Sequence, residues 1–208
     1  VLDAVKSAFF GPFHVSVLFD PNGSNTTAAA AVLAVLDGLG GKVEGERIAV
    51  LGGTGPVGGR VGRLLVGLGA NVVLGSREIG RAQAAASRIG AKVDAFATAD
   101  PSSLTRGLRG ASAIVAAGAA GVTLLPRSVR SSLADARVLI DLNAVPPPGI
   151  EGVEPGDKRT DRDGALAWGA LGVGGTKMKI HKAALKSLFA ANDRVIDAEE
   201  ALAIGRSL

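Results

Sequence analysis

A glycine-rich run stands where a strand-like segment gives way to a helix-like one. The run Gly53-Thr54-Gly55-Pro56-Val57-Gly58 follows the apolar segment 48–51 and opens a segment with helical apolar spacing. Glycines at this spacing permit a tight turn, a close approach of backbone to a pyrophosphate and close packing of helix on strand. The free N–H groups at the helix start attract phosphate, and Pro56 fits there because its missing N–H would have no partner. We therefore predict that cofactor-binding residues are Gly53, Thr54, Gly55, Pro56, Val57 and Gly58.

A second feature decides whether this run is more than chance, because the chain has 30 glycines. An NAD site carries an acidic residue about 20 positions further on, at the end of the second strand, to hold the ribose 2′-hydroxyl. Here the segment 71–74 ends in Gly75-Ser76-Arg77. Arg77 can pair with a 2′-phosphate in a fork and Ser76 can add a hydroxyl donor; the alternative is a solvated arginine at a helix start. We expect NADP rather than NAD as the cofactor.

Two further residues follow strand-like segments, at the carboxyl edge where such sheets bind ligands. Gly118 comes after the fourth segment, where backbone can approach the nicotinamide half of the cofactor. Asn143 closes the run Asp141-Leu142-Asn143 after the fifth. Both are predicted cofactor contacts.

The elements that must position these residues alternate along the chain. Short apolar runs predict strands at 48–51, 71–74, 92–96, 112–116 and 138–141. Helical spacing predicts helices at 57–68, 79–89, 102–108 and 126–133. This alternation is typical of strand-helix-strand units in a parallel sheet. We expect an α/β fold, with a Rossmann-type doubly wound parallel sheet plus a partial α/β substrate domain.

The remaining segments divide the chain into three predicted parts. Residues 1–42 hold a helix at 2–10, a strand at 14–19, a polar loop and an alanine-rich helix to 39, and form part of the substrate domain. Residues 43–150 form the NADP-binding domain. Residues 151–208 are expected to return to the substrate domain as a charged surface loop through Asp163, a glycine-rich turn at 169–175, a helix at 177–191 and a last helix from Asp197.

Composition excludes several classes of function. A formal charge of +4 comes from scattered basic residues, and only 3% of residues are aromatic, so we expect no nucleic-acid partner. The absence of cysteine and of metal-ligand spacing predicts no metal site. The longest apolar stretch, 28–36, is too short to cross a bilayer. We expect a cytoplasmic protein without membrane contact. Val1 opens the chain inside an amphipathic stretch, which suggests that upstream residues are missing.

Several runs carry a family resemblance when they are taken together. They are Phe10-Gly11-Pro12-Phe13, the stretch 22–30, the glycine-rich run 53–58, Asn143-Ala144-Val145-Pro146-Pro147, and the stretch 169–175 with Lys177, Lys179 and His181. The chain resembles, over nearly its whole length, the NADP-dependent methylene-tetrahydromethanopterin dehydrogenases, relatives of methylene-tetrahydrofolate dehydrogenase. The resemblance implies oxidation of a reduced pterin's one-carbon bridge to the methenyl form, by a homo-oligomer in one-carbon metabolism. That family carries a further α/β portion upstream, so part of the pterin-binding domain is expected to be missing.

The implied reaction is direct hydride transfer, in which the protein mainly holds cofactor and pterin close and aligned. A polar loop offers several side-chain donors and acceptors for the pterin, although ordinary loop and cap chemistry explains them nearly as well. The predicted substrate-binding residues of this loop are Asp20, Asn22, Ser24, Asn25 and Thr26.

A second stretch supplies the predicted lysines. Lys177 and His181 are four residues apart and share a helix face, whereas Lys179 lies about 200° away from Lys177. We take Lys177, next to the glycine-rich segment, as the catalytic residue and Lys179 as a pterin contact; the alternative for each is a solvated lysine. His181 is interpreted as a cap or surface residue.

Two competing interpretations remain open. Ser76-Arg77 and Asp141-Leu142-Asn143 also resemble segments of shikimate dehydrogenases, whose catalytic Lys and Asp should lie in an N-terminal domain. No segment before the glycine-rich run offers that pair clearly. The other interpretation is a non-catalytic NADP-binding regulator, which would bind the cofactor without turnover.

Overall fold

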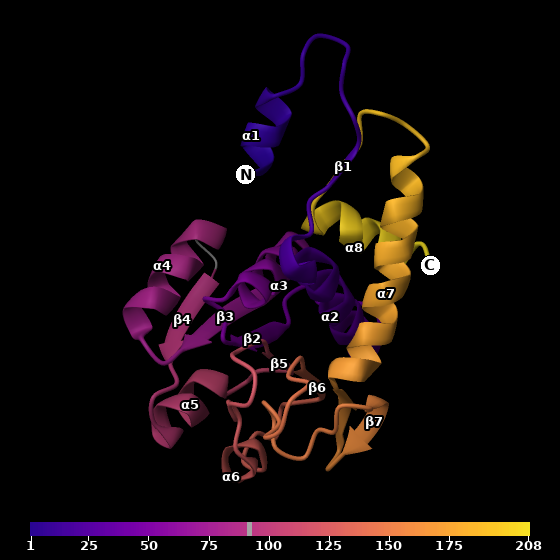
Figure 1. Cartoon of the computed structure of the whole chain (residues 1–208). Helices are drawn as coiled ribbons and strands as arrows, with labels where there is room; N and C mark the ends of the chain where they lie inside the picture. Colours follow the sequence, from indigo (N-terminus) through magenta and orange to yellow (C-terminus); the bar gives the residue numbers. More distant parts are fainter. Residues whose placement is uncertain (91–92) are drawn as a thin grey trace.

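A computed structural model of the chain describes residues 1–90 and 93–208. A seven-stranded sheet forms its centre, in the order β4-β3-β2-β5-β6-β8-β7 (Figure 1). The strands are β2 (Arg47–Leu51), β3 (Asn71–Ser76), β4 (Val93–Ala97), β5 (Ala113–Ala116), β6 (Val138–Asp141), β7 (Lys158–Arg162) and β8 (Ala165–Trp168). All neighbouring pairs are parallel except β7 with β8. The strand order diverges on either side of β2 and β5, and ligands of such sheets bind at that crevice.

Helices cover both faces of the sheet. One face is covered by α2 (Ser24–Gly38), α3 (Pro56–Gly67), α4 (Ile79–Ile89), α7 (Ala170–Leu188) and α8 (Ala198–Arg206). The other face carries α5 (Pro101–Leu108) and α6 (Arg127–Arg130). Alternating side chains of β2 supply the two cores: Ile48 and Val50 pack on the first face, and Ala49 and Leu51 on the second. The predicted α/β Rossmann-type fold is confirmed.

A small second sheet joins the two ends of the described chain. In it, β1 (Val17–Leu18) pairs in parallel with β9 (Val195–Ile196). The alanine-rich helix α2 is almost wholly buried because it contacts α3, α7 and α8. The N-terminal α1 (Leu2–Ser7) has no buried residue and stands away from the sheet, joined to β1 by an extended segment (Figure 1). A 3₁₀ turn, η1 (Pro21–Gly23), leads from β1 into α2.

Most predicted elements of the cofactor part are confirmed, and α4 has the predicted bounds. The first residue of the predicted strand 92–96 lies outside the described residues; β4 begins at Val93. The predicted strand 14–19 is wrong in extent, because only Val17–Leu18 pairs with a neighbour. The predicted helix 126–133 is shorter, at Arg127–Arg130.

Two predictions for the chain after residue 150 are wrong. The expected surface loop through Asp163 contains β7, whose charged residues lack apolar rhythm because it is an edge strand exposed on both faces. The expected glycine-rich turn at 169–175 is instead the first part of α7, which begins at Ala170. A Cβ atom on Gly169 or Gly172 would clash with the carbonyl oxygens of Glu154 or Asp157. These two glycines therefore let the start of α7 lie directly against the backbone of Glu154 and Asp157.

None of the helices in residues 1–90 and 93–208 combines the length and the apolar character that crossing a bilayer requires.

Candidate cofactor and substrate site

The glycine-rich run forms its turn at the end of β2. The turn is at Gly52, one residue earlier than predicted: its φ is +73°, and its N–H donates to the Gly75 carbonyl at 3.0 Å. A Cβ atom on Gly52 would lie 2.6 Å from the Cα of Gly118, so two backbones meet there. Gly53 instead packs beneath Leu74, from whose Cδ2 a Cβ atom would lie 2.8 Å. Gly52 is thus a residue that the spacing argument missed.

Helix α3 begins just after this turn, at Pro56. Gly55 is the N-cap residue, in an extended conformation, and no side chain caps the helix. A Cβ atom on Gly58 would lie 2.6 Å from the Gly52 carbonyl oxygen, so Gly58 lets the helix pack onto the turn itself. A helix start without a side-chain cap leaves N–H groups available to an anion.

A cavity of about 320 Å³ opens beside this helix start, along the carboxyl ends of β2, β3, β4 and β5. Three of its lining residues, Thr54, Gly55 and Pro56, come from the predicted glycine-rich run. Its full lining is Gly52, Thr54, Gly55, Pro56, Ser76, Arg77, Glu78, Arg81, Thr98, Ala117, Gly118, Ala119, Val122 and Leu124. The cavity therefore brings together predicted residues from three separate strand ends.

Arg77 lines the cavity with an exposed side chain. Within the described part of the chain, its guanidinium has no hydrogen bond or ion pair. Arg81, four residues later on α4, lines the same wall and pairs with Glu78 at 3.0 Å. Arg81 was missed by the sequence argument, although its spacing from Arg77 places both near one helix start. The wall thus offers two guanidinium groups, one of them unpaired.

Five predicted cofactor residues contribute differently. Gly118 lines the cavity, and a Cβ atom there would lie 2.6 Å from Leu124 Cδ1. Gly53, Val57 and Gly58 lie behind the lining, as packing residues. Asn143 is not in the lining.

Asn143 supports the loop that follows β5, part of which lines the cavity. Its Oδ1 accepts the Gly121 N–H at 3.3 Å and the Val145 N–H at 3.0 Å, and its Nδ2 donates to the Pro147 carbonyl at 2.8 Å. The neighbouring Asp141 carboxylate accepts the backbone N–H groups of Asn143 and Ile150. Burial raises the pKa of Asp141 despite these amide donors. The segment after β6 thus supports the loop beside the cavity through the Asn143 side chain and does not itself line the cavity.

The predicted substrate loop is largely a cap for α2. The Asp20 carboxylate accepts the N–H of Asn25 at 2.8 Å, the N–H of Thr26 at 3.1 Å and the Thr26 hydroxyl at 2.7 Å. Ser24 donates its hydroxyl to the Pro21 carbonyl at 2.7 Å. Ser24, Asn25 and Thr26 are all buried. Asn22 alone of the predicted loop residues is exposed, with a positive φ of 53°. Most of the loop's donors already have protein partners.

The structure brings Lys177 and His181 to this loop, but not Lys179. A Cβ atom on Gly23 would lie 2.6 Å from Lys177 Nζ, so the ammonium rests against the start of α2. His181 Nδ1 lies 3.6 Å from Asp20 Oδ2. Lys179 is exposed, as its angle on the helix predicts. Within residues 1–90 and 93–208, no three His, Cys, Asp or Glu side chains are grouped to hold a metal ion.

Comparison with known proteins identifies the relatives of this chain. It is 44% identical to the bifunctional protein MdtA of Methylorubrum extorquens, over 100% of this chain and 74% of that protein. The chain belongs to the methylene-tetrahydromethanopterin dehydrogenase family. It is also 34% identical to the NAD(P)-dependent methylenetetrahydromethanopterin dehydrogenase of the same organism, over 85% of this chain and 63% of that one. The predicted resemblance is confirmed, although the chain spans only part of each relative. No family model matches the chain.

Solved structures of other proteins resemble this chain in fold. A transhydrogenase from Sinorhizobium meliloti superposes with a TM-score of 0.60 at 20% identity, over 80% of this chain and 52% of that one. At this identity the likeness shows the fold alone. This member of the methylene-tetrahydromethanopterin dehydrogenase family thus shares its Rossmann-type fold with that transhydrogenase.

Proposed function

We propose that this chain is an NADP-dependent oxidoreductase that oxidises methylene-tetrahydromethanopterin, or methylene-tetrahydrofolate, to the methenyl form. The observation that carries the proposal is the cavity at the glycine-rich turn, in a chain of this family. Its lining joins a helix start, an unpaired arginine and a glycine-bearing loop. That combination suits an elongated anionic cofactor.

The lining groups fit NADP in sign and order. The N–H groups at the start of α3 would hold the pyrophosphate, because no side chain occupies them. Arg77 would pair with the 2′-phosphate, with Ser76 and Arg81 beside it on the same wall. Because Gly52 and Gly118 have no side chains, their backbone could lie close to the nicotinamide half of the cofactor. When bound, NADP supplies the hydride acceptor.

On the pterin side, Lys177 is the proposed catalytic residue. Its Nζ rests on Gly23 at the start of α2, and it has no hydrogen-bond partner within the described residues. A free ammonium there can donate to a polar atom of the pterin and orient its CH₂ group toward the cofactor. The two nitrogens flanking that carbon stabilise the cation left when hydride departs, so no side-chain base is required. The buried groups of the loop would support the start of α2 beside Lys177 rather than bind the pterin.

Near-ultraviolet absorbance of NADPH tests the proposal. The protein is mixed with NADP and, in parallel, with methylene-tetrahydromethanopterin or methylene-tetrahydrofolate. A signal that grows with either substrate supports the proposal, and the ratio of rates gives the preferred carrier. Silence with both, while NADP still binds in a titration, contradicts the activity and leaves the regulator interpretation.

A further inference from the structure

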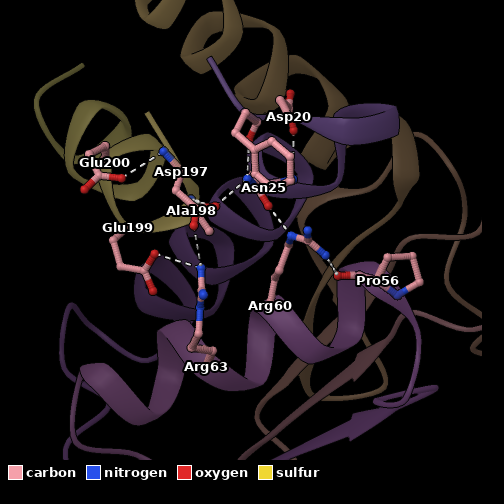
Figure 2. A network of polar contacts seen from close by, with 10 residues as sticks. Asp20, Asn25, Pro56, Arg60, Arg63, Asp197, Ala198, Glu199 and Glu200 are labelled. Carbon is pink, nitrogen blue, oxygen red and sulfur yellow. Dashed lines mark hydrogen bonds and ion pairs between the residues drawn. The ribbon is translucent and has the colours of Figure 1, made fainter. Parts of the chain in front are cut away.

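A network of polar contacts connects the glycine-rich turn with the buried loop at the start of α2 (Figure 2). Arg60, on the second turn of α3, is its central member. Its Nη1 donates to the Pro56 carbonyl at 2.7 Å, and its Nε donates to Asn25 Oδ1. One planar guanidinium thus joins the first residue of α3 to the first turn of α2.

Asn25 passes the connection to a third element. It is fully buried, and its Nδ2 donates both to the Phe19 carbonyl and, at 2.7 Å, to Asp197 Oδ1. Asp197 is the N-cap residue of α8 and forms a capping box with Glu200. The Asn25 amide therefore holds the end of β1, the start of α8 and Arg60 together.

Other arginines near Arg60 lack this arrangement. Arg63, one turn later, pairs only with Asp197 at 3.4 Å and Glu199 at 2.8 Å, at the surface. Arg88 lines the same surface groove between α3 and α4 as Arg60, but its Nε donates only to Ala84 of its own helix. Only Arg60, of these three, touches both the cofactor turn and the loop beside Lys177.

We propose that Arg60 is a positioning residue that transmits occupancy of the cofactor cavity to the loop 20–26 and the start of α8. This inference rests on the proposed binding of NADP at the glycine-rich turn. Ligand binding orders the turn, and Pro56 lies at its edge, so a bidentate side chain fixed to Pro56 becomes a fixed support for Asn25. The N–H of Asn25 in turn donates to Asp20, which lies beside His181. Gly23, two residues before Asn25, lies beside Lys177.

Residue-resolved hydrogen exchange, with and without NADP, tests this coupling without any pterin. In the wild type, NADP slows exchange at the amides of Gly53, Thr54, Gly55, Val57 and Gly58 and, by about fivefold, at the amides of Asn25, Thr26 and Ala198. In Arg60→Met, NADP still slows exchange at the glycine-rich turn but no longer slows it at the amides of Asn25, Thr26 and Ala198. Arg60→Lys keeps the charge but cannot bridge both acceptors, so it behaves like Arg60→Met. Arg88→Met, the matched control, behaves like the wild type.

The other outcomes contradict the coupling in recognisable ways. Protection of Asn25 and Thr26 that persists in both Arg60 variants overturns it. Loss of protection at the turn as well makes Arg60 a cofactor contact and overturns its positioning role. Absence of protection everywhere in the wild type overturns the cofactor proposal instead. Where methylene-pterin turnover is present, kcat of Arg60→Lys falls about tenfold while the Kd for NADP changes less than twofold.

Discussion

The cofactor cavity and the polar loop 20–26 looked alike in the sequence, as two places rich in hydrogen-bonding groups. In the structure they differ in whether those groups are free. Among the residues that the structure describes, the cavity presents a start of α3 without a side-chain cap and an Arg77 without a partner. The loop turns its groups inward, so that Asn25 and Thr26 are fully buried and Asp20 accepts three hydrogen bonds from the chain.

The difference shows that polar residues at a helix start have two opposite uses. Where glycines remove side chains, the helix start stays open to a ligand. Where Asp, Ser, Asn and Thr gather, they satisfy the helix start themselves. The first arrangement leaves room for the proposed ligand, and the second makes a support against which Lys177 lies.

The largest expected effect concerns the support. Asn25→Leu leaves the Asp197 carboxylate and the Arg60 Nε without their buried partner, so the free energy of unfolding should fall by about 3 kcal/mol. Urea denaturation measures it. Asn22→Gly, at the exposed position of the same loop, is the matched control, because glycine tolerates the positive φ there; it should change stability by less than about 0.5 kcal/mol. Full stability of Asn25→Leu with loss of turnover would instead make Asn25 a substrate ligand and break the comparison.

A smaller effect is expected at Lys177, whose ammonium lies against this loop at Gly23. Lys177→Ala should lower kcat with the methylene-pterin about tenfold, equivalent to about 1.4 kcal/mol, and leave the Kd for NADP unchanged. Stopped-flow absorbance and a fluorescence titration measure the two. Lys179→Ala, on the exposed side of α7, serves as the control. A normal rate in Lys177→Ala combined with a slow Lys179→Ala would move the catalytic role to Lys179.

The sequence allowed much of the cofactor half to be predicted. Strand and helix alternation gave the elements from β2 to β6, because each buried parallel strand is an apolar run of its own. Gly55, Arg77 and Gly118, each predicted as a cofactor contact from its position at a strand end, line one cavity in the structure, and their binding role stays a prediction. The charged edge strand β7 was invisible, because exposure on both faces removes the apolar period.

What the sequence could not predict depends on contacts between distant segments. The buried Asn25 finds its partner in Asp197, far away along the chain. The glycines at the start of α7 resembled a turn in the sequence. They are needed because the helix approaches the backbone of Asp157, a contact that the helix's own sequence does not reveal. By contrast, Arg81 could have been found from its helical spacing to Arg77.

The central claim is that the open cavity holds NADP through its unpaired arginine. Calorimetric titration of NADP and NAD into the wild type and Arg77→Ala tests it, with Arg88→Ala as a control that keeps the net charge of the variant. We expect Arg77→Ala to raise the Kd for NADP by about tenfold or more, at least about 1.4 kcal/mol, and to leave the Kd for NAD nearly unchanged. Equal losses for both cofactors, or no loss for either, would contradict the claim.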